Sequence, residues 1–265
     1  MTAPTTAMVL AAGLGTRMRP LTDERPKALV ELAGKTLIDH MLDRLVQVGV
    51  RRAVVNVHAF ANRLEAHLAT RRDLEIVLSD ERACLLETGG GLKKALPLLG
   101  DAPILVANID SVWTDDAALS RLIAAWDPAR MDDLLMTVPL EHALGFDGPG
   151  DFFRDDDGRL THRGDATTAP LAHMGVHMLR PETIAGWPDG RHSAFAHWME
   201  MAARGRLHGV ITAGEWMHVG DPAARDAAEA RLASREGGRP VGRGVGGPRD
   251  IDDRKEADGT SVLPG

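Results

Sequence analysis

The segment from Ala7 to Lys27 constrains the fold of this chain more than any other stretch. It opens with a short apolar run, residues 7–12, whose length and flanking residues are typical of a buried β-strand. The run ends at Gly13 and Gly15, which allow a tight turn and let a ligand approach the backbone N–H groups. Cations follow closely, at Arg17, Arg19, Arg25 and Lys27. This order suits a polyphosphate, which needs its charge neutralised at several oxygens at once.

The glycine segment does not match the two best-known phosphate motifs. A Walker loop requires Gly-Lys-Ser/Thr, and the dinucleotide fingerprint requires a third glycine where Met18 stands. Residues 13–22, followed by Pro26 and Lys27, instead resemble the signature of the sugar-1-phosphate nucleotidylyltransferases. The resemblance extends over residues 7–232, and its motifs are stronger before residue 140 than after it.

In enzymes of that family the loop wraps a nucleoside triphosphate. The resemblance therefore implies that Arg17 clamps the leaving pyrophosphate and that Lys27 holds the reacting phosphates. It also implies that the backbone around the turn binds the nucleotide, at Ala11, Ala12, Gly13, Leu14, Gly15 and Thr16.

Composition places the chain among soluble globular proteins. Of its 265 residues, 44% are hydrophobic and 26% charged, and no apolar run approaches the roughly 20 residues that a membrane helix needs. The start of the chain lacks the pattern of a signal peptide, and the single cysteine, Cys84, cannot form an internal disulfide. We expect a cytoplasmic protein without a membrane partner. The net charge of −7 argues against binding to nucleic acid but allows a nucleotide in a local basic pocket.

The pattern beyond the glycine segment alternates between strands and helices. Strands are expected at 52–57, 74–78, 103–107, 133–140, 173–179 and 208–211. Helices are expected at 37–46, 61–70, 93–99, 117–126, 195–204 and 222–234. This alternation predicts an α/β fold with a doubly wound, mostly parallel, Rossmann-like sheet and helices on both faces. Ligands of such sheets bind beyond the carboxyl ends of the strands, where the glycine segment would lie.

A second glycine segment, Glu87-Thr88-Gly89-Gly90-Gly91, precedes the helix expected at 93–99. By itself such a run indicates a flexible turn. It also closely resembles the branch of the family that joins UTP to N-acetylmuramate 1-phosphate, and there this position contacts the nucleobase. The resemblance implies that Glu87, Gly89 and Gly90 read a pyrimidine through their backbone groups.

A carboxylate follows the strand expected at 103–107, in the sequence Asn108-Ile109-Asp110. At the end of a central strand Asp110 is well placed to hold Mg²⁺ against a triphosphate, although a turn or cap is the ordinary role of such an aspartate. The resemblance implies that Asn108 contacts the nucleotide, and Ile109 departs from the family's Asn-Gly-Asp. Two further acids, Asp115 and Asp116, have the spacing of a helix cap.

The second metal ligand departs from the family pattern. The family has an aspartate where this chain has His218, and imidazole suits manganese or zinc better than magnesium. Mg²⁺ is the expected cofactor, with Mn²⁺ as an alternative, and Asp110 and His218 are the candidate ligands. Asp221, three residues further on, is a third candidate at an unfamiliar spacing.

Two later segments carry weaker signals. Residues 150–152 resemble a segment that lines the sugar pocket in the muramate branch, and 155–158 is typical of a hairpin tip. Residues 1–234 are expected to form one nucleotidyltransferase domain. Residues 235–265 are rich in glycine and have few large apolar side chains, so we expect a disordered tail.

The interpretation is transfer of a nucleotidyl group from an NTP, UTP by resemblance, to a sugar 1-phosphate, with release of pyrophosphate. Such a reaction is in-line and needs no covalent enzyme intermediate, so alignment and charge neutralisation carry the catalysis. Two alternatives stay open: a relative that acts on mannose or glucose 1-phosphate, and a nucleotide- or sugar-binding homologue without turnover. The sequence leaves the sugar, the choice between uracil and thymine, and the oligomeric state open.

Overall fold

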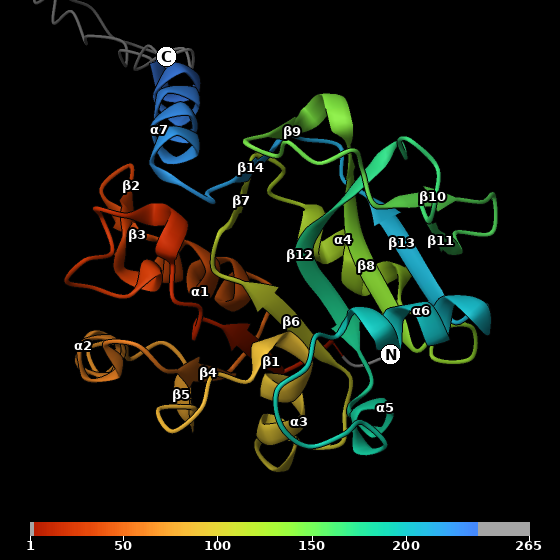
Figure 1. The fold of residues 1–265 in the computed structure, drawn as a ribbon, viewed down its shortest axis with the longest axis horizontal. Helices are drawn as coiled ribbons and strands as arrows, with labels where there is room; N and C mark the ends of the chain where they lie inside the picture. The colour runs from red at the N-terminus through yellow and green to blue at the C-terminus, as the bar shows by residue number, and fades with distance from the viewer. Residues whose placement is uncertain (1–2, 238–265) are drawn as a thin grey trace, which may run out of the picture.

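The computed structural model describes residues 3–237. Within them a nine-stranded sheet runs through the centre and helices cover both of its faces (Figure 1). Its parallel part has the order β6-β1-β4-β5, from strands Ile104–Asn108, Thr6–Leu10, Arg52–Val57 and Glu75–Asp80. The α/β fold with a parallel core is therefore confirmed. Residues 238–265, most of the segment expected to be a disordered tail, lie outside the described residues.

The other part of the sheet is largely antiparallel, which the sequence did not indicate. Strand β12, Leu171–Leu179, pairs antiparallel with both β6 and β8, the latter spanning Asp133–Pro139. The chain between β8 and β12 makes short strands instead of a helix, β9 (Ala143–Leu144), β10 (Phe152–Arg154) and β11 (Leu160–His162). Without a helical crossover β12 returns in the opposite direction. Strand β13, Leu207–Ile211, then adds parallel to β8.

Two hydrophobic clusters lie on opposite faces of the sheet. Alternate residues of β1 point to opposite sides, so Ala7 and Val9 join one cluster and Met8 the other. The first cluster is covered by α1 (Leu37–Gln47), α2 (Ala61–Leu68) and α4 (Ala118–Ala125). The second is covered by α3 (Glu87–Leu99), α5 (Pro181–Ala185) and α6 (Phe195–Ala203).

Smaller elements complete the fold. A second sheet has the order β7-β14-β9, in which β7 is Ser111–Trp113 and β14 is Trp216–His218. A two-stranded sheet joins β2 (Glu31–Leu32) to β3 (Lys35–Thr36), and α7 (Pro222–Gly237) follows β14. No helix in the described residues is both long enough and apolar enough to span a membrane.

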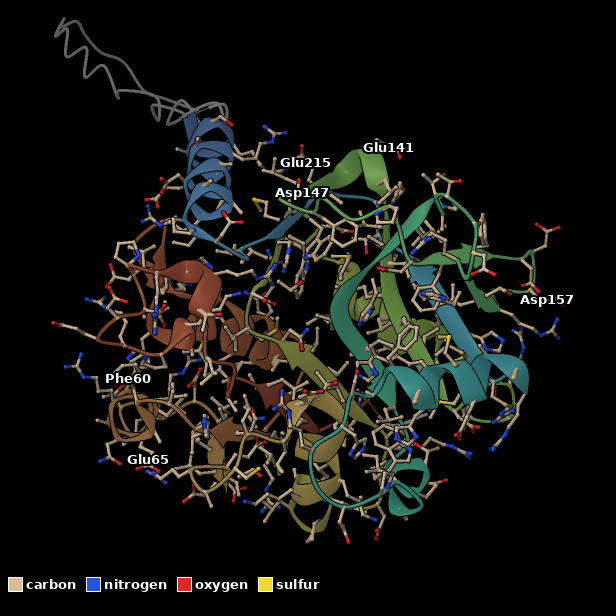
Figure 2. The ribbon with its side chains drawn as sticks, in the orientation of Figure 1. Phe60, Glu65, Glu141, Asp147, Asp157 and Glu215 are labelled. Atoms are coloured by element: carbon tan, nitrogen blue, oxygen red, sulfur yellow. The ribbon has the colours of Figure 1, made fainter. Side chains whose placement is uncertain are left out.

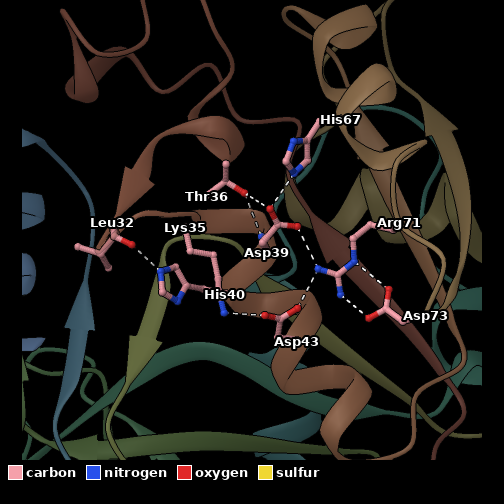
Figure 3. A network of polar contacts seen from close by, with 9 residues as sticks. All are labelled: Leu32, Lys35, Thr36, Asp39, His40, Asp43, His67, Arg71 and Asp73. Carbon is pink, nitrogen blue, oxygen red and sulfur yellow. Dashed lines mark hydrogen bonds and ion pairs between the residues drawn. The ribbon is translucent and has the colours of Figure 1, made fainter. Parts of the chain in front are cut away.

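A polar network fastens the start of α1 to the chain after α2 (Figure 3). Asp39 accepts hydrogen bonds from the Thr36 hydroxyl at 2.7 Å, from His67 at 2.8 Å and from Arg71 at 3.1 Å. Arg71 also bonds to Asp43 at 2.8 Å. Burial alone would raise the pKa of Asp39, but Thr36, His67 and Arg71 outweigh it and lower that pKa. The network holds α1 and α2 in place on the parallel half of the sheet.

Candidate active site

A cavity of about 360 Å³ opens where the parallel strands end. Its walls come from the carboxyl ends of β1, β4, β5 and β6, from the first turn of α3, and from a loop just before α6. The lining residues are Leu10, Ala11, Ala12, Gly13, Lys27, Asn56, Glu81, Leu85, Glu87, Thr88, Asn108, Ile109, Asp110 and Ser193. The position agrees with the rule that ligands of open α/β sheets bind beyond the carboxyl ends of the strands.

The glycine loop after β1 borders this cavity and has a defined backbone. Gly15 has a φ of 62°, and its carbonyl accepts a hydrogen bond from the buried Thr22 hydroxyl at 2.8 Å. A Cβ atom at Gly15 would stand 2.9 Å from the Cβ of Lys27, so glycine lets the two parts of the loop approach closely. Gly13 has open space around it and lines the cavity.

The remaining loop residues that the sequence singled out lie outside the lining of this cavity. Leu14, Thr16 and Arg17 are all exposed, and Thr16 and Arg17 belong to a single 3-10 turn, Thr16–Met18. Arg17 is therefore an exposed charge on the loop that borders the cavity, outside the cavity walls. Ala11 and Ala12 line the cavity, but both of their N–H groups donate to the side chain of Asn56, at 2.6 and 3.1 Å.

The second glycine run lies inside a helix, whereas the sequence placed it before one. Helix α3 begins at Glu87, so Gly89, Gly90 and Gly91 form its first turns. The N–H groups of Gly89 and Gly90 both donate to the carbonyl of His192, at 3.0 and 3.1 Å. A Cβ atom at Gly90 would collide with the carbonyl oxygen of Gly190. The glycines thus let the 190–193 loop pack against the helix.

This packing determines which groups of the segment face the cavity. Gly89 and Gly90 are buried and their amides already have protein acceptors, so they do not line it. Glu87 does line it, with a left-handed φ of 61° and an ion pair to Arg191 at 2.7 Å. Thr88 and Ser193 complete this wall; Thr88 belongs to the glycine segment recognised in the sequence, whereas no local pattern indicated Ser193.

Three side chains from distant parts of the sequence meet at the end of β6. Lys27 Nζ lies 2.8 Å from Asp110 Oδ2, and His218 Nε2 lies 3.6 Å from the same oxygen. Strand pairing produces this arrangement, because β14 runs beside β7 with His218 opposite Ser111. Burial alone would raise the pKa of the Asp110 carboxyl, but the His218 imidazole and the Lys27 charge hold that pKa well below its usual range.

Asp110 and His218 are thus the residues that could share a metal ion. Within residues 3–237, no three or more His, Cys, Asp or Glu side chains are grouped to hold a metal on their own. Two ligands suit an ion that takes its other ligands from a triphosphate and water, as Mg²⁺ commonly does. The structure places Asn108 at the same strand end, in the cavity lining.

The other acidic candidates lie elsewhere. Asp221 Oδ1 accepts from Ala224 N at 2.9 Å and so caps α7. Asp115 accepts from Ala117 N at 3.1 Å, but α4 begins after Ala117 without a side-chain cap, so the cap expected at Asp115 and Asp116 does not form. Asp151 Oδ2 accepts from His173 N at 2.8 Å in the β10–β12 region.

The hairpin tip expected at 155–158 is confirmed, because the turn joins β10 to β11. Figure 2 shows Asp157 at the outer end of this hairpin, projecting away from the body of the molecule. Glu141 and Glu215 lie at another edge, where β9 pairs with β14 (Figure 2). Asp157 and Glu141 are exposed, whereas Glu215 is half-buried and pairs with Arg231 at 2.7 Å.

Comparison with known proteins gives a consistent result. The MobA-like NTP transferase domain family matches residues 7–239. An N-acetylmuramate alpha-1-phosphate uridylyltransferase from Caulobacter vibrioides is 56% identical over 237 residues, covering 87% of this chain and 98% of the relative. A protein of the same name from Neisseria meningitidis serogroup B is 36% identical, covering 81% of this chain and 92% of that one.

A solved structure shares the fold. The inositol-1-phosphate CTP transferase from T. maritima superposes with a TM-score of 0.72 at 17% identity, covering 89% of this chain and 98% of that one. At this identity the likeness supports the fold alone.

Proposed function

Because the chain belongs to the MobA-like NTP transferase family and is a sugar-1-phosphate nucleotidyltransferase, we propose that it joins UTP to N-acetylmuramate α-1-phosphate. The observation that carries the proposal is the 56% identity to a uridylyltransferase of this name across nearly all of that relative. The cavity at the strand ends, with Lys27 and Asp110 in its wall, supports it independently. The products are UDP-N-acetylmuramate and pyrophosphate, and the reaction would serve recycling of cell-wall peptidoglycan.

In the reaction a phosphate oxygen of the sugar 1-phosphate attacks the α-phosphorus of UTP. The bond from that phosphorus to the bridging oxygen of pyrophosphate breaks, and pyrophosphate leaves with the electron pair. No side chain needs to form a covalent bond, so the protein contributes alignment and charge. We propose that the nucleotide binds between the glycine loop and the first turn of α3, both of which line the cavity.

Lys27 and Arg17 are proposed to divide the task of neutralising phosphate charge. The Lys27 side chain is only 10% exposed and lies in the cavity wall, which suits contact with the reacting phosphates. Arg17 is exposed beside the cavity, which suits the pyrophosphate as it leaves toward solvent. Each charge is worth more to the transition state, where negative charge spreads over the transferred group, than to the bound substrates.

We propose that Asp110 and His218 hold a divalent cation, Mg²⁺ or alternatively Mn²⁺. When bound, the cation neutralises the triphosphate and orients its oxygens. The side chains fit because Asp110 offers a carboxylate and His218 holds an imidazole nitrogen 3.6 Å from it. Lys27 forms an ion pair with Asp110 Oδ2, the oxygen that would bind the cation. When the cation takes this oxygen, the Lys27 ammonium group can bind a substrate phosphate instead.

The base is proposed to face Glu87 and Thr88. These residues and Ser193 form the cavity wall opposite the glycine loop, and the segment 87–91 resembles the uridine-specific branch. We also propose that residues 1–234 act as one domain and that the enzyme works in the cytoplasm. A reducing compartment suits its single, exposed and unpaired cysteine, Cys84.

The test is pyrophosphate release with Mg²⁺ and a panel of substrates. We expect the highest kcat/KM with UTP and N-acetylmuramate 1-phosphate, compared with CTP, dTTP, ATP and GTP and with glucose and mannose 1-phosphates. A purine nucleotide or another sugar phosphate that performs better would contradict the substrate assignment. Nucleotide binding without turnover for any pair would instead identify a binding protein.

A further inference from the structure

Two buried polar side chains in the cavity wall, Asn56 and Glu81, have no part in the reaction described above. Asn56 belongs to β4 and is 3% exposed, whereas Glu81 directly follows β5 and is fully buried. Both side chains line the cavity. Buried polar groups of this kind are costly unless every one has a partner, so their hydrogen bonds indicate what they hold.

Asn56 holds the glycine loop. Its Oδ1 accepts hydrogen bonds from the N–H groups of Ala11, at 2.6 Å, and Ala12, at 3.1 Å. The two backbone donors leave no choice of amide orientation, because only oxygen can accept them. The first two N–H groups after β1, those of Ala11 and Ala12, therefore point toward Asn56. Only the N–H groups of the glycine loop beyond Ala12 are available to bind phosphates.

Glu81 connects Asn56 to the base-facing segment. Its Oε1 accepts from Asn56 Nδ2 at 2.8 Å, and its Oε2 accepts from the N–H of Leu86 at 3.0 Å. Leu86 is the residue immediately before α3. The carbonyl of Glu81 accepts from Cys84 N at 3.0 Å and contacts His58 Nδ1 at 2.7 Å, so its backbone is also fixed.

Helix α3 packs directly on this pair. A Cβ atom at Gly91 would stand 2.9 Å from Glu81 Oε1 and 3.2 Å from Asn56 Nδ2. The third glycine of the run therefore leaves room for the hydrogen bond between the two side chains. One continuous chain of hydrogen bonds thus leads from the glycine loop through Asn56 and Glu81 to the start of α3.

We propose that Asn56 and Glu81 are positioning residues, which set the phosphate-binding loop at a fixed separation from the base-binding wall. The proposal rests on the proposed function and adds two residues to that site. Nucleotidyl transfer depends on placing two anions in line, and small displacements of the loop cost much of the rate. A nucleotide bound at its base by one wall and at its phosphates by the other requires the two walls to be held together.

Single substitutions that keep the shape but change the donors test this pairing. In the wild type, Glu81 accepts from two donors, Asn56 Nδ2 and Leu86 N. In Glu81→Gln the amide oxygen can accept from only one of them, and the new NH₂ group faces the other donor. In Asn56→Asp two carboxyl groups meet where a donor is needed. Because a buried donor or acceptor loses its partner, we expect kcat to fall about tenfold or more in each. For Asn56→Asp, kcat should recover at lower pH, because a proton on either carboxyl restores the donor.

The double variant Asn56→Asp/Glu81→Gln reverses the direction of the central hydrogen bond and satisfies every group again. The new carboxylate accepts from Ala11, Ala12 and the new amide, whose oxygen accepts from Leu86. We expect its kcat with UTP to return to within about threefold of wild type, since all four buried bonds are re-formed. A double variant that folds but is as slow as the slower single variant would overturn the proposal.

Two controls separate positioning from a general loss of stability. Thr137→Val removes the hydrogen bond from the Thr137 hydroxyl on β8 to Val210 O on β13, away from the cavity. It should lower the thermal midpoint while leaving kcat unchanged. Gly91→Ala crowds the pair without removing a polar group and should lower kcat, whereas Gly186→Ala, in open space, should not.

The readouts distinguish this proposal from the proposed function. If wild-type protein releases no pyrophosphate with any substrate pair, the proposed function fails. If wild type is active, single variants that fold and keep kcat within about twofold overturn the positioning role alone. If the single variants fail to fold, two other proteins test the proposal. The double variant should fold with a kcat near that of wild type, and Gly91→Ala should have a lower kcat than wild type.

Discussion

At the scale of single residues, the contact between Lys27 and Asp110 keeps the Asp110 carboxylate charged and paired. The two atoms lie 2.8 Å apart, and neither side chain is more than a quarter exposed, at 10% and 23%. His218 approaches the same carboxylate oxygen and stacks on Trp216 with ring centres 5.5 Å apart. Asp110 therefore stays deprotonated well below neutral pH, ready to receive a cation in place of the lysine.

Replacing the two cations that are proposed to neutralise phosphate charge tests this arrangement. We expect Lys27→Ala and Arg17→Ala each to lower kcat/KM by about a hundred- to a thousandfold, the usual cost of removing one electrostatic contact to a transition state. Arg51→Ala, at an exposed position before β4, is the matched control and should retain full activity. Steady-state rates of pyrophosphate release provide the measurement, and unchanged rates in both catalytic variants would refute their assignment.

The proposed metal ligands, Asp110 and His218, can be distinguished by titrating Mg²⁺ and Mn²⁺ against wild type, Asp110→Asn and His218→Asp. We expect Asp110→Asn to lose at least about a hundredfold in rate at every metal concentration, because the neutral amide is a poor substitute for a carboxylate. His218→Asp restores the carboxylate that the family has at this position, and should lower the Mg²⁺ concentration needed for half-maximal rate. A fully active Asp110→Asn variant would remove the metal site from the mechanism.

At the scale of elements, β12 connects the site to the second half of the sheet. Its register with β8 shifts between His173 and His177, and Gly175 lies in the shifted part with a φ of 72°. A Cβ atom at Gly175 would stand 2.7 Å from Asn108 Nδ2, so the irregular strand makes room for a residue of the cavity. The antiparallel strand thus shapes the site although no residue of β12 lines it.

The same strand carries a half-buried histidine, His173, whose protonation opposes folding. Burial, followed by the neighbouring His177, lowers the pKa of His173 to about 3. The unfolded chain binds a proton at about pH 6.5 and the folded chain does not, so this contribution to stability is complete above pH 6.5 and is lost as pH falls toward 3. The slope between these limits is at most about 1.4 kcal/mol per pH unit.

Urea unfolding at pH 7 and pH 4 measures this effect. We expect His173→Gln to lose less stability between the two pH values than wild type does, because the amide does not titrate. His142→Gln changes an exposed histidine and should behave as wild type. Equal pH dependence in wild type and His173→Gln would contradict the assignment to His173.

At the scale of the whole molecule, the cavity lies between two hydrophobic layers that are built from different parts of the chain. One face of the sheet packs on α1, α2 and α4, and the other on α3, α5 and α6. Cavity residues range from Leu10 to Ser193, so the site forms only when the ends of β1, β4, β5 and β6 meet the loop that precedes α6. Among the described residues, Leu232 in α7 is the last that packs on the core.

A chain that ends after residue 237 should therefore retain its activity. All cavity residues, His218 and the hydrophobic contacts of α7 lie before that point. We expect kcat/KM within about twofold of the full chain and a thermal midpoint within about 3 °C. Removing residues 222–265 is the contrasting deletion: it strips the contacts of Ala228 and Leu232 from the core and should lower the midpoint markedly.

Much of the fold followed from the sequence because it depends on local pattern. The strand expected at 52–57 coincides with β4, and the helix expected at 37–46 with α1 to within one residue. An apolar run bounded by turn residues forms a strand wherever it lies, and a repeat of three to four residues forms a helix. The glycine turn with its cations was recognisable for the same reason, since its residues are adjacent in the chain.

The tertiary structure alone decided how distant residues meet. The glycines of α3 are explained by a loop about a hundred residues later, and His218 reaches Asp110 only because β14 pairs with β7. No local pattern singled out Asn56 or Glu81 in the sequence. Their roles depend on hydrogen bonds to residues 45 and 25 positions away. Local pattern determines which elements form, whereas the packing of one element against another determines which side chains share a site.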